Sequence, residues 1–287
     1  MIKSDGFSDT QIDQFRRWQR LSFGVLREVA DQLVPGMTER DATRLAVKAF
    51  AREGARRYFH PPVALFGVRT TCPEPWTTQS FYPTDYALGE DDPIIMDASP
   101  MFDGFVVDTS ISCTAGPASA EYAQVLADNL VYRDRVLEAV RAGATCREIA
   151  VDVDQHLTSR GYRNRHGKHP EAVLGHQVVH LSDRGMLPDT PIEPFSPAGY
   201  APIGGGTPSA VVLGWFIKGI AAAHADGSMP PTWNDTPLCS HLASSGLWAV
   251  EPHIGLGGIG VKWEELLVVD GRDAYWLDDQ VPHLSTT

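Results

Sequence analysis

The strongest constraint on the fold is a pair of aspartates that a predicted β-hairpin places opposite each other. Asp97 lies in the strand-like segment PIIMDAS (93–99) and Asp108 lies in FVVDTSIS (105–112), and a short turn joins the two segments. A hairpin centred between positions 102 and 103 pairs Asp97 with Asp108. Since like charges directly opposite each other destabilise a sheet, this pair needs a physical explanation.

A second predicted hairpin repeats the arrangement near the C-terminus with two glutamates. The segments LWAVEPHIG and GIGVKWEELLVVD are joined by glycines, and a centre between Gly257 and Gly258 pairs Glu251 with Glu264. The same glycines form the pattern GLGGIG, which indicates dinucleotide binding when a strand precedes it and a helix follows it. Here a strand-like run follows, so the pattern predicts a hairpin tip.

Four carboxylates in apolar strands favour bound divalent cations. Shared protons could relieve the repulsion, but two divalent cations would neutralise the four charges. An imidazole ligand would come from VLGHQVVHL, where His176 and His180 are four residues apart and share one face of a strand. Oxygen-rich sites with one imidazole suit Mn²⁺, Fe²⁺, Co²⁺ or Zn²⁺. The sequence therefore predicts a site for two divalent metal ions.

Predicted helices precede each group of strands in two similar arrangements. The four helices are expected over residues 12–33, 38–54, 120–140 and 146–159. Each pair is joined through Gly-x-Thr, first at Gly36 and again at Gly143, 107 residues later. The threonine is a plausible N-cap in both copies. The pattern indicates an α+β chain built from two duplicated halves.

Composition disfavours several classes of partner and location. A chain of 287 residues with a net charge of -12 does not favour binding to nucleic acid or to anionic lipid. The four cysteines are scattered, match no zinc or redox spacing, and predict free thiols in a reducing compartment. The polar N-terminus does not resemble a signal peptide. We therefore expect a cytoplasmic protein with no nucleic-acid or membrane partner.

A long Pro- and Gly-rich segment, from about 184 to 247, separates the histidines from the glutamates. It contains an apolar run over 208–225, which Lys218 interrupts. A central lysine costs about 2.5–3.5 kcal/mol in a lipid bilayer, so a buried or lid-forming segment is the better interpretation. We interpret 184–247 as an insert or lid within a single domain that covers 1–287, since loops of this length are usually functional or disordered.

Taken in order, these segments resemble the motifs of the creatinase / methionine aminopeptidase / Xaa-Pro aminopeptidase family of metallopeptidases. MDASPMFDGFVVDTS is similar to its D-x10-D segment, LGHQVVH to its GH-x-x-G strand, AVEPHIG to its xEPG segment and GIGVKWEELLVVD to its GIRxEDxxxV segment. The resemblance covers residues from about 20 to 278. It implies the pita-bread fold, with duplicated α+β halves around a curved antiparallel sheet, and a homodimer.

The resemblance also implies a role for each candidate residue. The metal ligands would be Asp97, Asp108, His176, Glu251 and Glu264. Asp108 and Glu264 would bridge two metal ions, and Glu251 would also act as general base toward a water that the metals activate. His176 directly follows a glycine, as the GH motif requires. Family members with an HxxxH strand use the second histidine, which here is His180, so His180 is the alternative ligand and a candidate catalytic residue.

Two accessory histidines that contact the scissile amide in the family's peptidases are missing at the expected positions. The positions 17 and 18 residues before the first aspartate carry Ser80 and Gln79, and the position seven residues after His176 carries Asp183. His253 follows Glu251 by two residues on the same strand face, so it is a candidate catalytic replacement.

Four other histidines have weaker sequence support. His224 and His241 lie in the long segment and would approach the metals if that segment folds over the site. His166 and His169 lie in the basic loop RNRHGKH, for which we expect solvent exposure.

The resemblance implies an aminopeptidase-like hydrolase that cleaves a C–N amide bond in a small peptide-like substrate. The missing accessory histidines and the long segment leave two alternatives open. One is a specialised, non-peptidase metalloenzyme of the same fold, with a biosynthetic role and iron-dependent oxidative chemistry. The other is a binding homologue that has lost catalysis, against which the presence of all five ligand residues argues.

Overall fold

Two similar pairs of helices frame the molecule. The computed structural model describes residues 7–55, 57–178, 232–271 and 273–284. Its α-helices are α1 (Asp9–Ala30), α2 (Glu39–Arg52), α3 (Ala120–Arg141) and α4 (Cys146–Ser159). Helices α1 and α3 have 22 residues each, and α2 and α4 have 14 each. The four predicted helices are therefore confirmed, and their lengths repeat from one half to the other.

The repeated Gly-x-Thr join is a turn followed by an N-cap in both halves. Gly36 and Gly143 have φ values of 92° and 79°, which glycine adopts without steric cost. Thr38 and Thr145 are the N-caps of α2 and α4, and each closes a capping box with the acidic residue three positions later. The local sequence thus starts the second helix of each pair by the same mechanism.

Strands of the described chain form antiparallel sheets. They are β1 (Arg57–Tyr58), β2 (Val63–Phe66), β3 (Pro93–Ala98), β4 (Pro100–Phe102), β5 (Phe105–Val106), β6 (Thr109–Thr114), β7 (Arg163–Asn164), β8 (Gly175–Gln177), β9 (Thr232–Trp233), β10 (Gly246–Val250), β11 (His253–Leu256), β12 (Ile259–Lys262), β13 (Glu265–Asp270) and β14 (Asp273–Trp276). The sheet orders are β1-β4-β5, β14-β13-β10-β8-β9, β12-β11-β7 and β2-β3-β6. Short 3₁₀ helices are η1 (Gly67–Thr71), η2 (Thr78–Phe81), η3 (His166–Lys168), η4 (Pro170–Ala172), η5 (Pro237–Cys239) and η6 (Pro282–Leu284).

The turn of the first hairpin lies one residue beyond its predicted centre. Phe102 pairs with Phe105, so the loop consists of Asp103 and Gly104, both with positive φ. Asp-Gly is the dipeptide that a two-residue hairpin turn of this kind favours, and this local preference decides the register. Asp97 consequently pairs with Ser110 rather than with Asp108, and the predicted pairing was wrong.

The shift of two positions leaves both aspartates on the same face of the hairpin, because side chains alternate with period two. Asp108 falls in the interruption between β5 and β6, diagonal to Asp97.

The second hairpin has the predicted register. Val250 pairs with Glu265 and His253 pairs with Lys262, so the interruption between these pairs holds Glu251 opposite Glu264. The GLGGIG pattern is the hairpin tip, since β12 follows it and no helix does.

The two hairpins meet through their backbones. Ser110 and Glu264 form an antiparallel bridge, with N···O distances of 3.4 Å and 3.3 Å. Next to it, the Ser112 hydroxyl donates to Lys262 O at 2.7 Å and accepts from Lys262 N at 2.8 Å. This junction brings the carboxylates of the two halves together.

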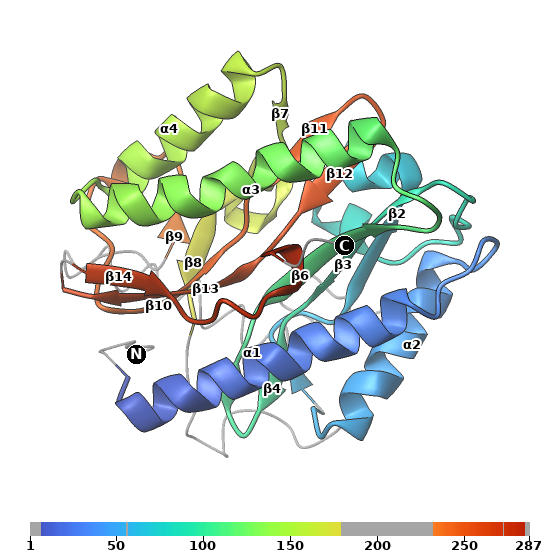
Figure 1. The fold of residues 1–287 in the computed structure, drawn as a ribbon, viewed down its shortest axis with the longest axis horizontal. Helices are drawn as coiled ribbons and strands as arrows, with labels where there is room; N and C mark the ends of the chain where they lie inside the picture. The colour runs from blue at the N-terminus through green and yellow to red at the C-terminus, as the bar shows by residue number, and fades with distance from the viewer. Residues whose placement is uncertain (1–6, 56, 179–231, 272, 285–287) are drawn as a thin grey trace.

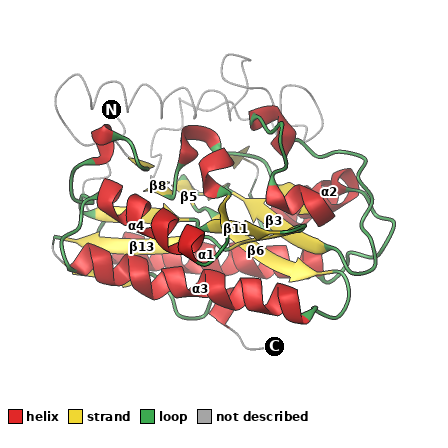
Figure 2. Cartoon of the chain, turned by 90° about the horizontal axis from the view of Figure 1, so that it is seen from above, coloured by secondary structure: helices red, strands yellow, loops and turns green. Residues whose placement is uncertain are grey.

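Each half supplies a hydrophobic core, and the central strands belong to both. Leu247 and Ala249 of β10 pack in the core of α1 and α2, whereas Trp248 and Val250 pack in the core of α3 and α4. In Figure 1 the long helices α1 (blue) and α3 (green) run across the view on either side of the strands. Figure 2 shows the strands across the middle of the molecule with α3 along one side.

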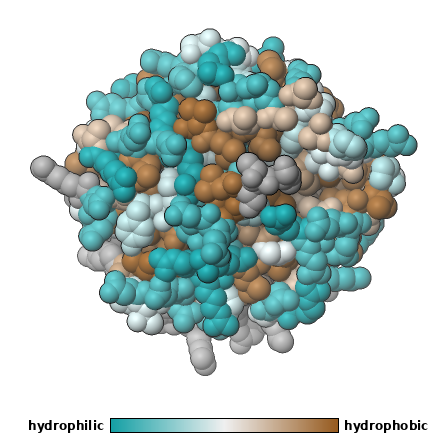
Figure 3. Space-filling view, in the orientation of Figure 1, coloured by the Kyte–Doolittle hydropathy of each residue, from teal (hydrophilic) through white to brown (hydrophobic). Residues whose placement is uncertain are grey.

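The predicted insert falls mostly outside the described residues, including the apolar run 208–225. Its last part is described and joins the sheet, where Trp233 of β9 pairs with Gly175 of β8. The Trp233 ring stacks on Trp248 with centroids 5.0 Å apart. No helix among the described residues is long and apolar enough to cross a membrane. Figure 3 shows apolar and polar residues interspersed on the face drawn in Figure 1.

Gly260 of β12 packs directly on the first half, and its substitution tests this contact. A Cβ added there would lie 2.0 Å from Thr70 O. We therefore expect Gly260→Ala to lower the free energy of unfolding by about 1–3 kcal/mol or more, measured by urea denaturation. Gly258→Ala is the matched control, because a Cβ at that position meets nothing within 4 Å. Equal stability of the two variants would contradict the close packing.

Candidate metal centre

Interruptions between strands position most of the predicted ligands. Asp108 lies between β5 and β6, Glu251 between β10 and β11, and Glu264 between β12 and β13, while Asp97 and His176 lie on β3 and β8. All five residues are buried, with at most 8% of their surface exposed. The fold thus gathers side chains from both halves at one buried place.

One group of possible ligands contains Asp108, His176 and Glu264. His176 Nε2 lies 3.3 Å from Asp108 Oδ2 and 3.9 Å from Glu264 Oε1. His176 Nδ1 lies 3.1 Å from Gln177 O, and since a carbonyl oxygen only accepts, Nδ1 is the protonated nitrogen. The lone pair of Nε2 in the neutral ring therefore points toward the carboxylates. Metal-binding imidazoles are commonly oriented through their other nitrogen in this way.

A second group contains Asp97, Asp108 and His60, and the sequence analysis did not identify His60. Its Nε2 lies 3.2 Å from Asp108 Oδ1 and 3.7 Å from Asp97 Oδ1. One potential ligand atom from each residue of a group lies within 4.8 Å of the others, and Asp108 belongs to both groups. Desolvation would lower the pKa of His60, but the charges of Asp108 and Asp97 raise it to about 9. The only signal for this residue in the sequence was a histidine shortly before β2.

A buried lysine lies among three of the four carboxylates. Lys262 Nζ is 2.5 Å from Asp97 Oδ2, 2.9 Å from Glu264 Oε2 and 3.0 Å from Glu251 Oε2. Burial alone would lower the pKa of Lys262, but the carboxylates outweigh it and hold this pKa well above its usual value. The lysine is two residues before Glu264 on the same strand face, a spacing that could have revealed it. It offsets one of the four negative charges that the sequence analysis counted.

The carboxylates differ in how readily they ionise. Burial would raise the pKa of Asp108, but His60 and His176 hold it below its usual value. Burial and the charge of Asp108 together raise the pKa of Glu264 well above its usual range. A cation bound at Glu264 would lower this pKa, because it favours the ionised carboxylate.

Removal of the Lys262 charge should destabilise the metal-free protein. Lys262→Met leaves three buried carboxylates without their shared cation, and breaking a buried ion pair in this way costs about 3–5 kcal/mol. The free energy of unfolding would be measured in urea after treatment with EDTA. Lys168→Met is the matched control, because its pair with Glu74 is exposed and should contribute less than about 1 kcal/mol. Equal effects of the two substitutions would contradict the buried cluster.

The side chain of His169 points into the site and is only 7% exposed, so the prediction that it is solvated was wrong. His169 Nδ1 lies 2.6 Å from Glu251 Oε2, and its Nε2 lies 3.1 Å from His253 Nδ1. His253 Nε2 lies 2.7 Å from Thr70 O and must donate to it, so His253 Nδ1 accepts a proton from His169 Nε2. A hydrogen bond between His169 Nδ1 and Glu251 Oε2 would require one more proton on this pair. Tertiary structure keeps this histidine away from solvent, because η3 and η4 fold the loop back onto Glu251.

The pKa shifts support a neutral His253, but those of His169 and Glu251 both disfavour a proton between these two groups. Burial would raise the pKa of Glu251, but Lys262 and His169 keep it below its usual value. Burial lowers the pKa of His169 and lowers that of His253 further. His253, a predicted catalytic residue, therefore reaches Glu251 only through His169.

Other predicted residues lie elsewhere or outside the described chain. His166 is also buried, contrary to expectation, and contacts Asp154 Oδ1 at 3.0 Å. His241 lies 2.9 Å from Leu242 O and 3.9 Å from Cys146 Sγ, so its described contacts are not with the carboxylates. His180, His224 and Asp183 lie outside the described residues. The choice between His176 and His180 stays a prediction, which the position of His176 beside Asp108 favours.

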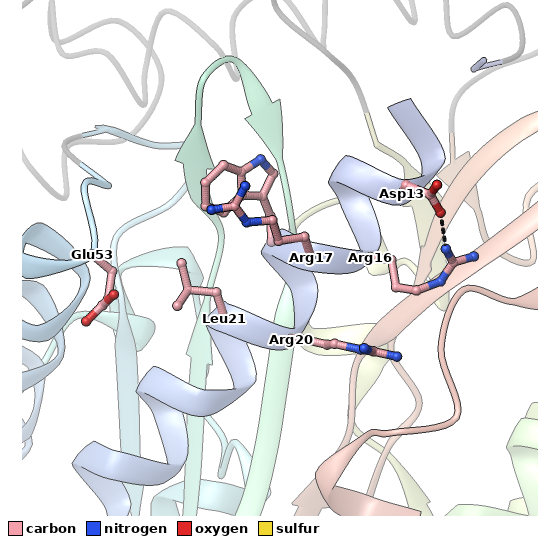
Figure 4. Close-up of a pocket in the computed structure, with 7 residues that line it drawn as sticks. Asp13, Arg16, Arg17, Arg20, Leu21 and Glu53 are labelled. Atoms are coloured by element: carbon pink, nitrogen blue, oxygen red, sulfur yellow. Dashed lines mark hydrogen bonds and ion pairs between the residues drawn. The ribbon is translucent and has the colours of Figure 1, made fainter. Parts of the chain in front are cut away.

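A cavity of about 670 Å³ lies along α1, apart from this cluster. Its seven lining residues are Asp13, Arg16, Arg17, Trp18, Arg20, Leu21 and Glu53, and they include none of the five predicted ligands. Figure 4 shows Arg16 directed at Asp13, and Arg20 binds Asp278. Two of its three arginines are therefore already paired with carboxylates, which does not favour an anion site.

Comparisons with known proteins relate the chain to metallopeptidases. The sequence model described as metallopeptidase family M24 matches residues 13–201, more than half of the chain. That stretch includes Asp97, Asp108 and His176, whereas both glutamates lie beyond it. A sequence comparison with curated proteins found no significant match.

Solved structures share the fold. An X-Pro aminopeptidase from Thermotoga maritima MSB8 has a TM-score of 0.65 at 17% identity, with 96% of this chain and 62% of that chain covered. The prolidase from Pyrococcus horikoshii OT3 has a TM-score of 0.64 at 14% sequence identity, with 96% of this chain and 62% of that chain covered. The Xaa-Pro dipeptidase from Bacillus anthracis has a TM-score of 0.62 at 15% identity, with 97% of this chain and 62% of that chain covered. The chain thus spans about three fifths of these proteins, and the predicted α+β pita-bread fold is confirmed.

Proposed function

The chain belongs to metallopeptidase family M24, and from this premise we propose that it is a dinuclear metal-dependent hydrolase that cleaves a C–N amide bond in a small peptide-like substrate. The observation that carries the proposal is the pair of ligand groups that share Asp108. A carboxylate common to two groups is suited to bridge two cations.

The donor set fits divalent metal ions on two counts. Asp97 Oδ1 is buried and has no hydrogen-bond donor among the described residues. Such an oxygen is costly in a folded protein, and a cation would satisfy it. The groups also combine carboxylate oxygens with imidazole nitrogens, a mixture that Mn, Fe, Co and Zn accept. The residues that would hold two ions are Asp97, Asp108, His176, Glu251 and Glu264.

The chain's own residues can move and hold the protons of a hydrolysis. Two bound divalent ions would polarise the scissile carbonyl and lower the pKa of the attacking water. Glu251 would accept the proton from that water, since its carboxyl group has a low pKa and is ionised. His169 and Lys262 both contact Glu251 Oε2 and fix the carboxylate in position. Glu251 would then pass this proton to the leaving amine.

The names of the structural neighbours suggest the first substrates to test. They are described as X-Pro aminopeptidase, prolidase and Xaa-Pro dipeptidase. We infer that short peptides with proline in the second position are the substrates to examine, because the fold and the family are shared. Because the accessory histidine is missing at Gln79 and Ser80, we infer that His169, which lies beside Glu251, is an alternative for contact with the amide.

A direct test combines metal content with peptide cleavage. The full chain would be reconstituted with Mn²⁺, Co²⁺, Fe²⁺ or Zn²⁺, analysed for metal, and assayed on a panel of Xaa-Pro dipeptides and tripeptides. We expect nearly two equivalents of metal, and cleavage that EDTA abolishes and metal restores. Failure to bind any metal would overturn the proposal, and so would two bound metals with no cleavage of any peptide.

An oxidative metalloenzyme of the same fold is the second candidate. The specific observation in its favour is His60, which places an imidazole on each side of Asp108 where the family motifs supply one histidine. Imidazole and carboxylate donors also suit iron that reacts with oxygen. Oxygen consumption that requires iron, without cleavage of peptides, would support this candidate over hydrolysis.

A further inference from the structure

We propose that His60 is a metal ligand on the Asp97 side of the centre, so that each of the two metal ions has one imidazole. The inference rests on the proposed dinuclear site and adds a sixth ligand to the five that the sequence motifs contain. His60 lies three residues before β2 and belongs to none of the sequence motifs described above.

The protonation of the His60 ring follows from its contacts. Its Nδ1 lies 3.0 Å from Pro61 O, which can only accept, so Nδ1 carries the proton of the neutral ring. Its Nε2 then presents a lone pair to Asp108 Oδ1 at 3.2 Å and to Asp97 Oδ1 at 3.7 Å. A lone pair that faces two carboxylate oxygens is repulsive unless a proton or a metal ion lies between them.

His176 repeats this arrangement on the other side of the same carboxylate. Each histidine has its Nδ1 near the backbone oxygen of the next residue, at 3.0 Å for His60 and 3.1 Å for His176. His60 Nε2 faces Asp108 Oδ1 and His176 Nε2 faces Asp108 Oδ2. The predicted ligand and His60 are thus placed equivalently about the shared aspartate, which gives them equivalent roles.

The backbone around His60 is held on both sides. Phe59 N donates to Ser99 O at 2.8 Å, and Val63 pairs with Asp97. Two prolines, at positions 61 and 62, restrict the chain between these anchors. The Phe59 ring also stacks on the His176 ring, with centroids 6.0 Å apart. Such fixed geometry is what a metal ligand needs, because a mobile side chain loses entropy when it binds.

An imidazolium in an ion pair with Asp108 is the competing role, and it predicts the opposite sign. If His60 is a ligand, its removal weakens the binding of one metal ion. If His60 instead stands in place of a cation, its removal frees Asp97 and Asp108 and strengthens metal binding. The change in affinity on substitution therefore separates the two roles.

The experiment is a titration of the metal-stripped full chain with Co²⁺, followed by calorimetry and by visible absorption. We expect two equivalents for the wild type. For His60→Ala we expect one equivalent to remain tight and the other to weaken by about 100-fold or more, with a changed cobalt spectrum. His156→Ala is the matched control, since His156 contacts the Tyr132 hydroxyl rather than a carboxylate.

Each outcome decides the inference. Binding of both equivalents to His60→Ala at wild-type or higher affinity overturns the ligand role and leaves the dinuclear site intact. A wild type that binds no cobalt overturns the proposed function and the ligand role together. Circular dichroism of the stripped proteins checks folding, and His60→Gln, which keeps a polar side chain of similar length, provides a second variant if His60→Ala does not fold. For that variant too, unchanged affinity would overturn the inference.

Discussion

Asp108→Asn should remove both metal ions and most of the activity. Among the described residues, Asp108 is the one member common to the two ligand groups, and, against the effect of burial, His60 and His176 lower its pKa, which favours the ionised carboxylate. Asparagine has nearly the same volume but no charge, so both ligand groups lose the negative charge that they share. Metals contribute several kcal/mol of transition-state stabilisation, so we expect kcat/KM to fall by on the order of 10³-fold or more. Elemental analysis and peptide hydrolysis measure the two effects.

A loss of folding would have a different signature. Burial would raise the pKa of Asp108, but contacts with His60 and His176 lower it, so its charge stabilises the folded protein at neutral pH. The metal-free variant should therefore be less stable than the metal-free wild type in urea, while circular dichroism still shows it folded. Asp103→Asn is the matched control, because Asp103 is exposed on the hairpin turn and asparagine also tolerates its positive φ. Retention of two metals by Asp108→Asn would contradict the bridging role.

Glu251→Gln should slow catalysis by about 10²- to 10⁴-fold in kcat/KM, the usual contribution of a general base. Glutamine keeps the shape of the side chain and can still contact His169, but it cannot accept the proton of the attacking water. Glu251 is not a member of the ligand group formed by His60, Asp97 and Asp108, so we expect at least one metal equivalent to remain bound. Steady-state kinetics at saturating metal, beside elemental analysis, measure both quantities.

Metal content separates the two roles of this glutamate. Loss of both metals from Glu251→Gln would show that Glu251 acts mainly as a ligand, and wild-type kcat/KM would show that it is not the base. Glu138→Gln, an exposed position on α3, is the matched control and should leave both quantities unchanged.

Local sequence signals predicted the framework of the site. The helix starts follow from Thr38 and Thr145, and the second hairpin follows from its glycines, which fix where the strands reverse. The first hairpin was misplaced by one residue because hydrophobic alternation alone does not locate a turn. The preference of Asp-Gly for positive φ decided it, and that signal was present in the sequence.

The places of His169 and His60 in the site could not be predicted in the same way, because long-range packing brings these residues there. His169 precedes Glu251 by 82 residues and reaches it only after the loop folds back. His60 comes before the strand that pairs with Asp97, where no spacing rule connects it to Asp108. A charged or imidazole side chain in a polar loop looks solvated until the fold buries it, and this is why His166 and His169 were misjudged.

The order of the ligands along the chain sets when the metals can be loaded during synthesis. Asp97 and Asp108 belong to the first half, while His176, Glu251 and Glu264 belong to the second, and the Ser110–Glu264 bridge joins them. On the ribosome the first half is complete long before the last proposed ligand emerges at position 264. Until then the nascent chain exposes only half of the proposed site, so metals can be captured there only after both halves have been synthesised.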